Sequence, residues 1–502
     1  MKRSDTLRAV AAVVLFAAGL LAALPTPYKE RNVIFQAGGC YLDTAVIESK
    51  TGDIHGAVLL LHGLASNKKI MSYAARGYAA QNLRVIVPDL PGHGRTRGSF
   101  SPQRAEDCSA ALLHDLLARG MAQSDMLILA GHSMGATIAL RLADRFPVAG
   151  VVAISPAPMR AAHGANPETI LFPGTPSSVR NTLVVSGQWE LGAMRGNAAD
   201  LASSPYAVNT KFDVVPGGTH VSLIFDPRVV RRSQQWSAQL LRLNSGAPLP
   251  SLLPLVASFA GFVGILLIVD PFLRELTMDN RPLALNSGPA SYSWWKAAVT
   301  VASASAVAVL VLRWWNPLSV LRVFEADYFT AFLLFAGALL LAVYGRKSFG
   351  MLDPAPKSLL RAVLAAVLLL LLISGWFELT LSEAWLNVPR WSRFPFVLLL
   401  VLPVHLAEEI LLDDMQKLAG WRRLMAALSF RFIAWLAILI AIFHLHSGEV
   451  LLALLAPYFA LFCVLQRRGM DIVRSCTGSA AAAALFGAIL FGGFCLVIFP
   501  IT

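Results

Sequence analysis

Charged residues are scarce in this chain: they make up 14% of its 502 residues, where a soluble domain typically carries about 25%. Cysteine is scarce too, with five in all and no C-x-x-C pair, so the sequence predicts neither a zinc site nor a disulfide framework. Apolar residues, in contrast, reach 56%. These proportions exclude intrinsic disorder and an ordinary soluble enzyme, and they predict a protein that lies at least partly in a membrane.

Positive charge is in excess, with a formal net charge of +12, but the Lys and Arg residues do not form one run. They recur between apolar segments, which is typical of membrane topology rather than of a nucleic-acid site, so no nucleic-acid partner is predicted. Two cysteines, Cys40 and Cys108, precede the apolar C-terminal half. They can pair in an oxidising compartment, although we expect two unpaired buried thiols.

Residues 1–30 carry the pattern of a membrane-targeting segment. Lys2 and Arg3 precede an apolar run over residues 9–24 that prolines close. This pattern is typical of a signal peptide or of an uncleaved signal anchor, and both export the segment that follows. An anchor is favoured because residues 22–24 make a poor cleavage site.

Residues 31–245 have the pattern of an α/β domain. Short apolar runs rich in β-branched residues alternate with amphipathic stretches, which predicts βαβ units and a doubly wound, mostly parallel sheet. Runs that are apolar on both faces suit central strands covered by helices. The expected strands lie at residues 57–61, 83–88, 126–130, 148–154, 182–186 and 211–215.

Residues 246–502 have the pattern of an all-α polytopic membrane domain, with eight apolar runs near the length that crosses about 30 Å of hydrocarbon. If the anchor is a ninth span with a cytoplasmic N-terminus, most Lys and Arg residues of the connections fall on the cytoplasmic side. This predicts a multi-pass plasma (inner) membrane protein with its α/β domain and its C-terminus outside. The runs lie near residues 251–270, 295–313, 327–344, 360–378, 395–412, 424–443, 449–465 and 479–499.

The strongest local motif is Gly131-His132-Ser133-Met134-Gly135, between an expected strand and an expected helix. It has the form G-x-S-x-G, the nucleophile elbow, in its required strand–turn–helix setting. Small residues are needed two positions either side of the serine because the backbone turns sharply and lifts the hydroxyl above the sheet edge. We therefore expect Ser133 to act as a nucleophile.

Candidate partners for Ser133 come directly after other expected strands. Leu64 follows a His-Gly turn, where its backbone N–H can join that of Met134 to form an oxyanion hole. Further along the chain, Glu190 and His220 each follow a strand of their own. The order nucleophile, acid, histidine is the order of this motif class.

From about residue 33 to residue 243, the chain resembles the α/β-hydrolase family, and within it the monoacylglycerol-lipase-like and serine-aminopeptidase-like branch. The matching segments are LLLHGLASN, VPDLPGHGRT, LAGHSMGA, VVSGQWE and VPGGTHVSL, in family order. The resemblance implies that Ser133 is the nucleophile, His220 the general base, and Glu190 the carboxylate that orients the imidazole. The family more often has Asp as the acid, and Asp213 and Asp226 also flank this region.

The family carries a lid over its acyl pocket, inserted between two strands. In this chain the corresponding residues, 155–181, are few and rich in proline. The site is therefore either open or covered by the membrane half. A small lid and a membrane tether both suit an acyl substrate delivered from the bilayer surface.

Ionisable residues within the apolar runs are functional candidates by default. Glu408 and Glu409, with histidines later in the chain, faintly resemble the CAAX-protease-like membrane family, in which such residues bind a metal. However, Asp413 stands where that family has an arginine, and the predicted topology separates Glu409 from His444 by about 30 Å. We therefore favour interfacial snorkelling and helix capping for these residues. The set comprises His405, Glu408, Glu409, Asp413, Asp414, Arg431, His444 and His446.

The predicted function is that of a membrane-bound serine hydrolase, which cleaves a carboxylic ester, including a lipid ester, or an amide through an acyl-enzyme. Three alternatives stay open: an acyltransferase with the same triad, a transporter-like membrane protein with a regulatory hydrolase domain, and a triad-bearing binding module without turnover. The triad implies no cofactor and no metal. The expected partners are the lipid bilayer and a small-molecule or lipid acyl substrate.

Overall fold

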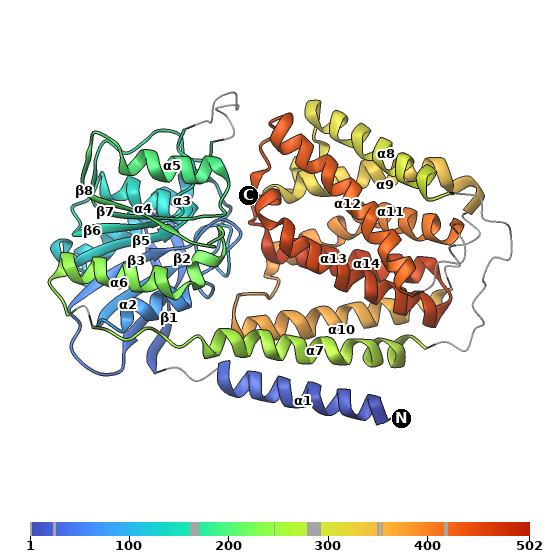
Figure 1. Ribbon diagram of the computed structural model, residues 1–502, viewed down its shortest axis with the longest axis horizontal. Helices are drawn as coiled ribbons and strands as arrows, with labels where there is room; N and C mark the ends of the chain where they lie inside the picture. Colours follow the sequence, from blue (N-terminus) through green and yellow to red (C-terminus); the bar gives the residue numbers. More distant parts are fainter. Residues whose placement is uncertain are drawn as a thin grey trace. The chain divides into compact units, whose positions relative to one another are not determined.

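The computed structural model divides the chain into two compact units (Figure 1). The α/β unit comprises Leu21–Val256, Glu378–Glu383 and Pro500–Thr502. The helical unit comprises Met1–Leu20, Ala257–Phe377 and Ala384–Phe499. The structure describes residues 3–23, 27–160, 170–244, 246–278, 293–348, 352, 355–415 and 420–502.

The α/β unit is built on one eight-stranded sheet with the strand order β1-β2-β4-β3-β5-β6-β7-β8. The pairs from β4 to β8 are parallel, whereas β2 pairs with both β1 and β4 in antiparallel orientation. The expected mostly parallel sheet is thereby confirmed. The strands are β1 Tyr28–Ala37, β2 Cys40–Ser49, β3 Gly56–Leu61, β4 Leu83–Pro88, β5 Leu127–His132, β6 Gly150–Ile154, β7 Val179–Gly187 and β8 Ala207–Val215.

The hairpin of β1 and β2 is missing from the strands that the sequence predicted. Most side chains of β1 are exposed, so the strand lacks the continuous apolar run that revealed the others. A signal was present in the turn between them: Gly38 and Gly39 have φ values of +54° and +75°. Two successive residues with positive φ form a hairpin turn that glycine adopts at little cost.

Helices cover both faces of the sheet, as Figure 1 shows, with α3, α4 and α5 on one face and α2 and α6 on the other. This arrangement explains why the central strands are apolar on both faces: every residue of β5 and β6 is buried. The helices of this unit are α2 Ser72–Ala79, α3 Pro102–Ala118, α4 Met134–Ala143, α5 Gly192–Ala202 and α6 Pro227–Leu241.

A disulfide joins Cys40, at the start of β2, to Cys108 in α3. The expectation of two unpaired thiols is therefore wrong. The pairing could not be predicted from the sequence, because the two residues are 68 positions apart and belong to different elements. The hairpin that brings Cys40 next to α3 was itself not predicted.

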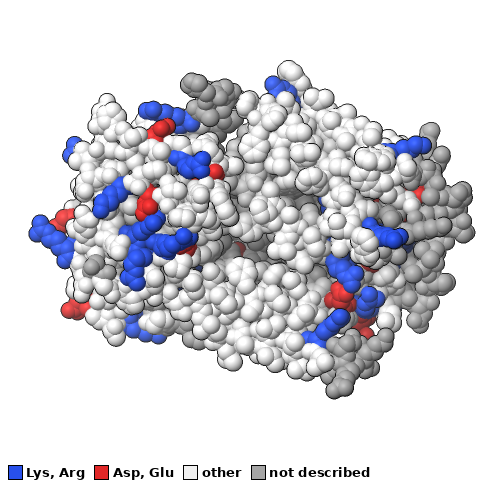
Figure 2. All heavy atoms as spheres, viewed as in Figure 1, with Lys and Arg blue, Asp and Glu red and all other residues white. Residues whose placement is uncertain are grey.

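The helical unit contains eight helices long and apolar enough to cross a membrane, among the residues that the structure describes. They coincide with the eight apolar runs of the sequence, and in the view of Figure 2 their surface is mostly without charged side chains. A further helix, α1 (Arg3–Ala23), covers most of the predicted anchor. The eight helices are α7 Leu253–Thr277, α8 Trp294–Trp314, α9 Ala326–Ser348, α10 Pro356–Thr380, α11 Val388–Asp414, α12 Trp421–His444, α13 Val450–Thr477 and α14 Ala480–Ile498.

Helix α13 extends twelve residues beyond the predicted run, to Thr477 rather than residue 465. The sequence pattern ended the run early because Arg467, Arg468 and Arg474 interrupt its apolar residues. The structure keeps them in the helix, and all three pair with carboxylates of other helices: Arg467 with Glu408 and Glu409, Arg468 with Asp270, and Arg474 with Asp413. Charge on one helix is thus neutralised by charge on its neighbours.

Buried ion pairs between α11, α12 and α13 form the polar centre of the helical unit. Arg431 binds both carboxylate oxygens of Glu408, at 2.7 and 2.8 Å. The fully buried Arg467 lies 3.0 Å from Glu408 and 2.6 Å from Glu409. The interpretation of these carboxylates as interfacial snorkelling and capping groups is wrong, because Glu409 is fully buried and is bound by arginines from two other helices, Arg423 and Arg467.

Candidate active site

Ser133 occupies the sharp turn between β5, which ends at His132, and α4, which begins at Met134. Its backbone has φ +52° and ψ −118°, a strained conformation for a residue with a side chain. A Cβ on Gly131 would lie 2.3 Å from the backbone of Gly135, and one on Gly135 would lie 2.2 Å from the Leu61 carbonyl oxygen. The two glycines are therefore required for the turn itself, as the motif predicted.

Glu190 and His220 lie side by side at the same edge of the sheet, after β7 and β8 respectively. The ring nitrogen Nδ1 of His220 is 3.2 Å from Oε1 of Glu190. Both residues are buried. Among the described residues, no hydrogen bond joins the Ser133 hydroxyl to the His220 ring, as is common before substrate tightens such contacts.

Two serines that the sequence analysis missed hold Glu190 in place. The hydroxyls of Ser155, at the end of β6, and Ser186, in β7, each donate a hydrogen bond to one carboxylate oxygen. The Ser155 oxygen also lies 2.7 Å from Nδ1 of His220. Burial alone would raise the pKa of Glu190, but the hydrogen bonds from His220 and the two serines outweigh it and lower that pKa. The carboxylate is therefore ionised at neutral pH.

A third residue that the sequence analysis missed, His132, contacts both the backbone and the ring of His220. Its Nε2 atom is 2.9 Å from the His220 carbonyl oxygen, and the two rings pack with their centroids 4.7 Å apart. Burial lowers the pKa of His132 to about 3, and the neighbouring His220 acts in the same direction. The His132 ring is thus neutral at pH 7 and donates an N–H to the backbone that carries His220.

The two alternative acids have other partners. Asp213 pairs with Arg232 at 2.7 Å. Asp226 caps the first turn of α6, where its side chain accepts a hydrogen bond from the backbone of Arg228. Of the three candidate carboxylates, Glu190 is the one that contacts His220.

Of the predicted oxyanion-hole residues, Met134 directly follows Ser133, and Leu64 follows a turn that lies against Ser133. Met134 is the first residue of α4, so its backbone N–H has no partner within the helix. On the other side, a Cβ built on Gly63 would lie 3.2 Å from the Ser133 Cβ, which places the turn before Leu64 against the nucleophile. His62 fixes this turn: its Nε2 accepts a hydrogen bond from the Leu90 backbone N–H at 2.9 Å.

A buried lysine connects the loop after β3 to three carboxylates. The Lys68 ammonium is 2.7 Å from Asp89 and 3.2 Å from Asp43, and it also pairs with Glu383. Burial alone would lower the pKa of Lys68, but Asp89 and Glu383 outweigh it and raise that pKa. Lys68 lies four residues after Leu64, so these ion pairs hold the loop that carries Leu64. One of the partners, Glu383, belongs to the segment Glu378–Glu383, which is part of the α/β unit.

The structure thus brings the carboxylate, the imidazole and the elbow serine to one edge of the sheet, with two candidate backbone donors beside the serine. Such a group of residues can activate a hydroxyl for attack on a carbonyl carbon and hold the negative charge that develops on the oxygen. The described residues contain no group of three or more His, Cys, Asp or Glu side chains arranged to hold a metal ion.

Residues 58–278 match the profile of the alpha/beta hydrolase family. Among curated proteins, the chain is similar to the magnesium-chelatase 30 kDa subunit of Rhodobacter capsulatus, with 37% identity over 27% of this chain and 46% of that protein. It is also similar to Lipase 1 of Psychrobacter immobilis, with 31% identity over 20% of this chain and 32% of that protein. A third relative is Esterase YjfP of Escherichia coli, with 33% identity over 18% of this chain and 40% of that protein.

These matches span less than half the length of each of the three relatives. The three relatives have names of different activities, and two of them are named as a lipase and an esterase. The eight apolar helices of the C-terminal region are compatible with a multi-pass membrane protein. A region that matches the alpha/beta hydrolase profile is therefore joined in one chain to helices long and apolar enough to span a membrane.

Proposed function

We propose that the protein is a membrane-bound serine hydrolase that cleaves carboxylic esters through an acyl-enzyme. The observation that carries the proposal is the hydrogen bond between Glu190 and Nδ1 of His220, at the sheet edge where Ser133 adopts the strained conformation of a nucleophile elbow. The ester- and lipid-cleaving relatives support the same class of reaction.

The reaction follows from the roles of these groups. His220 removes the proton from the Ser133 hydroxyl through Nε2, and the hydroxyl oxygen attacks the ester carbonyl carbon. The backbone N–H groups of Leu64 and Met134 stabilise the oxyanion. His220 then gives its proton to the departing alcohol, which leaves the acyl group on Ser133, and water attacks this acyl-enzyme by the same route. Glu190 stabilises the imidazolium that forms in each half.

We further propose a location for the reaction. Residues 31–245 form the hydrolase domain at the extracytoplasmic face, and residues 246–502 form the domain that spans the membrane. The disulfide between Cys40 and Cys108 supports an oxidising compartment for the hydrolase domain. The distribution of Lys and Arg among the connections supports the same orientation. A hydrolase held at a membrane surface meets lipid esters there, and we propose these as its substrates.

Labelling with a fluorophosphonate probe tests the proposal. The probe reacts covalently with an activated serine, so the full-length protein in detergent is expected to be labelled and Ser133→Ala to remain unlabelled. His220→Ala is expected to react at least about a hundredfold more slowly, because the general base is lost.

Ser203→Ala is a matched control, since Ser203 is an exposed serine of the same unit at the end of α5. It should be labelled like the wild type. If the folded wild-type protein is not labelled, or if labelling persists in Ser133→Ala, the proposed nucleophile is wrong. If the wild type is labelled as expected, its hydrolytic activity is measured with monoacylglycerols and with short-chain esters of p-nitrophenol. The readout is the release of the carboxylic acid.

A further inference from the structure

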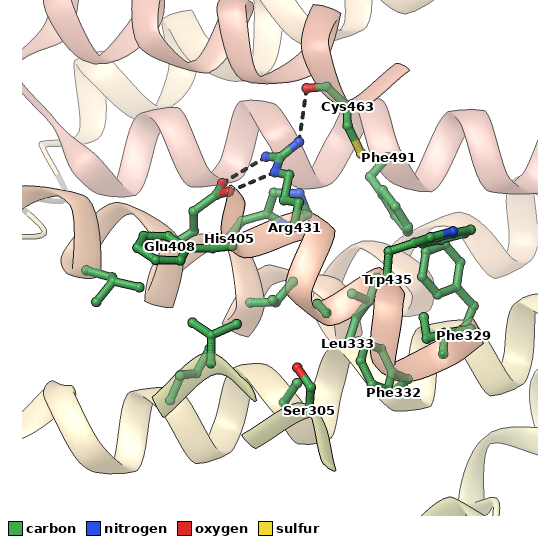
Figure 3. Close-up of a pocket in the computed structure, with 18 of the residues that line it drawn as sticks. Ser305, Phe329, Phe332, Leu333, His405, Glu408, Arg431, Trp435, Cys463 and Phe491 are labelled. Carbon is green, nitrogen blue, oxygen red and sulfur yellow. Dashed lines mark hydrogen bonds and ion pairs between the residues drawn. The ribbon is translucent and has the colours of Figure 1, made fainter. Parts of the chain in front are cut away.

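The helical unit encloses a cavity of about 110 Å³ that is unrelated to the Ser133 site (Figure 3). Six helices contribute to its walls: α8, α9, α11, α12, α13 and α14. The walls are mainly apolar, with aromatic rings such as Phe329, Phe332 and Phe491. The cavity approaches the size of an engineered apolar cavity of about 150 Å³ that binds benzene, so it can hold a short length of hydrocarbon.

The charged side chains at one end of the cavity are already paired. Figure 3 shows Arg431 pointing to Glu408, whose two oxygens it binds. Next to this pair, Gln466 contacts His405 at 2.9 Å and donates to the Gly487 carbonyl oxygen at 2.6 Å. The cavity therefore offers no unbalanced charge, and an ionised ligand would lose its hydration without gaining a counter-ion.

Two hydrogen-bond donors on the cavity wall have no partner among the described residues. These are the Ser305 hydroxyl and the indole N–H of Trp435. Ser305 is 1% exposed, and Figure 3 shows its hydroxyl pointing from α8 into the space below Arg431. The Trp435 ring is held by Phe329 and Phe459, at 5.2 Å between centroids in each case. Leaving such buried donors unpaired costs free energy.

We propose that this cavity binds an uncharged lipid, whose hydrocarbon chain contacts the aromatic walls and whose carbonyl oxygen accepts a hydrogen bond from Ser305 or Trp435. The apolar walls select the chain, the balanced charges exclude an ionised headgroup, and the unpaired donors require an acceptor. Part of the wall is only half-buried, at Leu333, Ala434 and Trp435, which gives a chain a route to the outside of the unit.

Photo-crosslinking tests this site. The full-length Ser133→Ala protein in phospholipid nanodiscs is irradiated with a monoacylglycerol that carries a diazirine in its acyl chain and an alkyne for detection. Adducts are expected on peptides of α8, α9 and α12, and excess unlabelled monoacylglycerol should displace the probe. The corresponding free fatty acid, which is anionic, should compete at least about tenfold less well because its charge has no partner in the cavity.

Variants separate the cavity from the general lipid surface. Ser305→Ala removes one donor with minimal change of shape and is expected to lower probe affinity about fivefold. Ala434→Phe fills the cavity and should abolish the adducts. The matched control is Ser303→Ala, an exposed serine on the same helix, which should behave like the parent protein.

The proposal is overturned if Ser305→Ala and Ser303→Ala bind the probe equally, or if adducts form only on residues outside the cavity. Equal competition by the free fatty acid would also overturn it. Because every protein in this experiment carries Ser133→Ala, the outcome is independent of whether the chain is a serine hydrolase. Thermal midpoints of the variants show whether each one is folded.

Discussion

The ion cluster of the helical unit and the candidate active site of the α/β unit both bury ionisable side chains, but they differ in how their charges are balanced. In the helical unit, Arg423, Arg431, Arg467 and Arg474 each contact at least one carboxylate. In the α/β unit, the carboxylate beside His220 is held by two hydroxyl groups and an imidazole instead of a permanent cation. One cluster is neutral by pairing, and the other keeps a negative charge next to a group that can take up a proton.

This difference indicates what each cluster does. Paired ions resist change, because breaking one pair leaves another charge buried without a partner. A carboxylate that hydroxyls stabilise is free to balance a positive charge that forms only during a reaction. The first arrangement suits a scaffold between helices, and the second suits catalysis. Substitutions that disturb each cluster separately test this interpretation.

The largest effect is expected for Arg467→Met in the helical unit. This change leaves Glu408, Glu409 and Asp471 without the fully buried guanidinium that contacts all three. Loss of one partner in a buried ion cluster destabilises a protein by about 3–5 kcal/mol. We expect a large fall in the thermal midpoint of the detergent-purified protein, or loss of its monodisperse peak in size-exclusion chromatography.

The neighbouring Arg468 provides a matched control. Its side chain is 48% exposed and pairs with one carboxylate among the described residues, that of Asp270. Exposed pairs contribute at most about 1 kcal/mol, so Arg468→Met should shift the midpoint little. Similar shifts for the two variants would contradict the view that the buried pairs form the scaffold.

The second-largest effect on stability is expected for loss of the disulfide in the α/β unit. A cross-link that closes a loop with a separation of 68 residues stabilises the folded state by about 4 kcal/mol, because it restricts the unfolded chain. The double variant Cys40→Ser with Cys108→Ser should therefore melt at a lower temperature, and reductant should have the same effect on the wild type. Cys476→Ser, in α13, is the control; a wild type that is insensitive to reductant argues against the cross-link.

A smaller effect is expected for Ser155→Ala at the candidate active site. Its hydroxyl contacts both Glu190 and His220, so its loss weakens the orientation of the pair without removing either group. We expect kcat/KM for a p-nitrophenyl ester to fall about tenfold, which corresponds to about 1.4 kcal/mol. An unchanged kcat/KM would show that Glu190 and His220 are positioned without this hydroxyl.

The same substitution has a pH dependence of defined sign. The pKa of Glu190 in the folded protein lies below its ordinary value of 4.5. The ionised carboxylate therefore contributes stability that is present above pH 4.5 and is lost as the pH falls through the lower, folded pKa. The difference in thermal midpoint between wild type and Ser155→Ala should be largest near pH 7 and should narrow as the pH falls through the folded pKa of Glu190. A difference that is constant across this range would contradict the assignment.

Local patterns were sufficient for much of the fold. The six apolar strands and the eight membrane-length helices could be predicted because burial on all sides requires continuous apolar runs, which are visible in sequence. The turn at Ser133 was predictable for a related reason: Gly131 and Gly135 stand where a Cβ would collide with backbone. The hairpin of β1 and β2 was missed because its side chains are mostly exposed and leave no such run.

The residues that surround the candidate site were harder to predict. Ser155, Ser186 and His132 are ordinary residue types at the ends of buried strands, and nothing in their local pattern marks them as partners of Glu190 or His220. The contacts of Lys68 were even harder to predict, because one of its partners, Glu383, is 315 residues away in the chain. Contacts over such separations depend on the path of the whole chain.

The sequence by itself determined which residues are apolar, where the chain turns sharply, and the order Ser133, Glu190, His220, because these are properties of neighbouring residues. Tertiary structure alone decided which charges meet. It paired Arg467 with Glu408 and Glu409, joined Cys40 to Cys108, and left Ser305, on a cavity wall, without a partner among the described residues. The physical reason is that the free energy of a buried polar group depends on what lies within a few ångströms of it, and distance along the chain does not fix that neighbour.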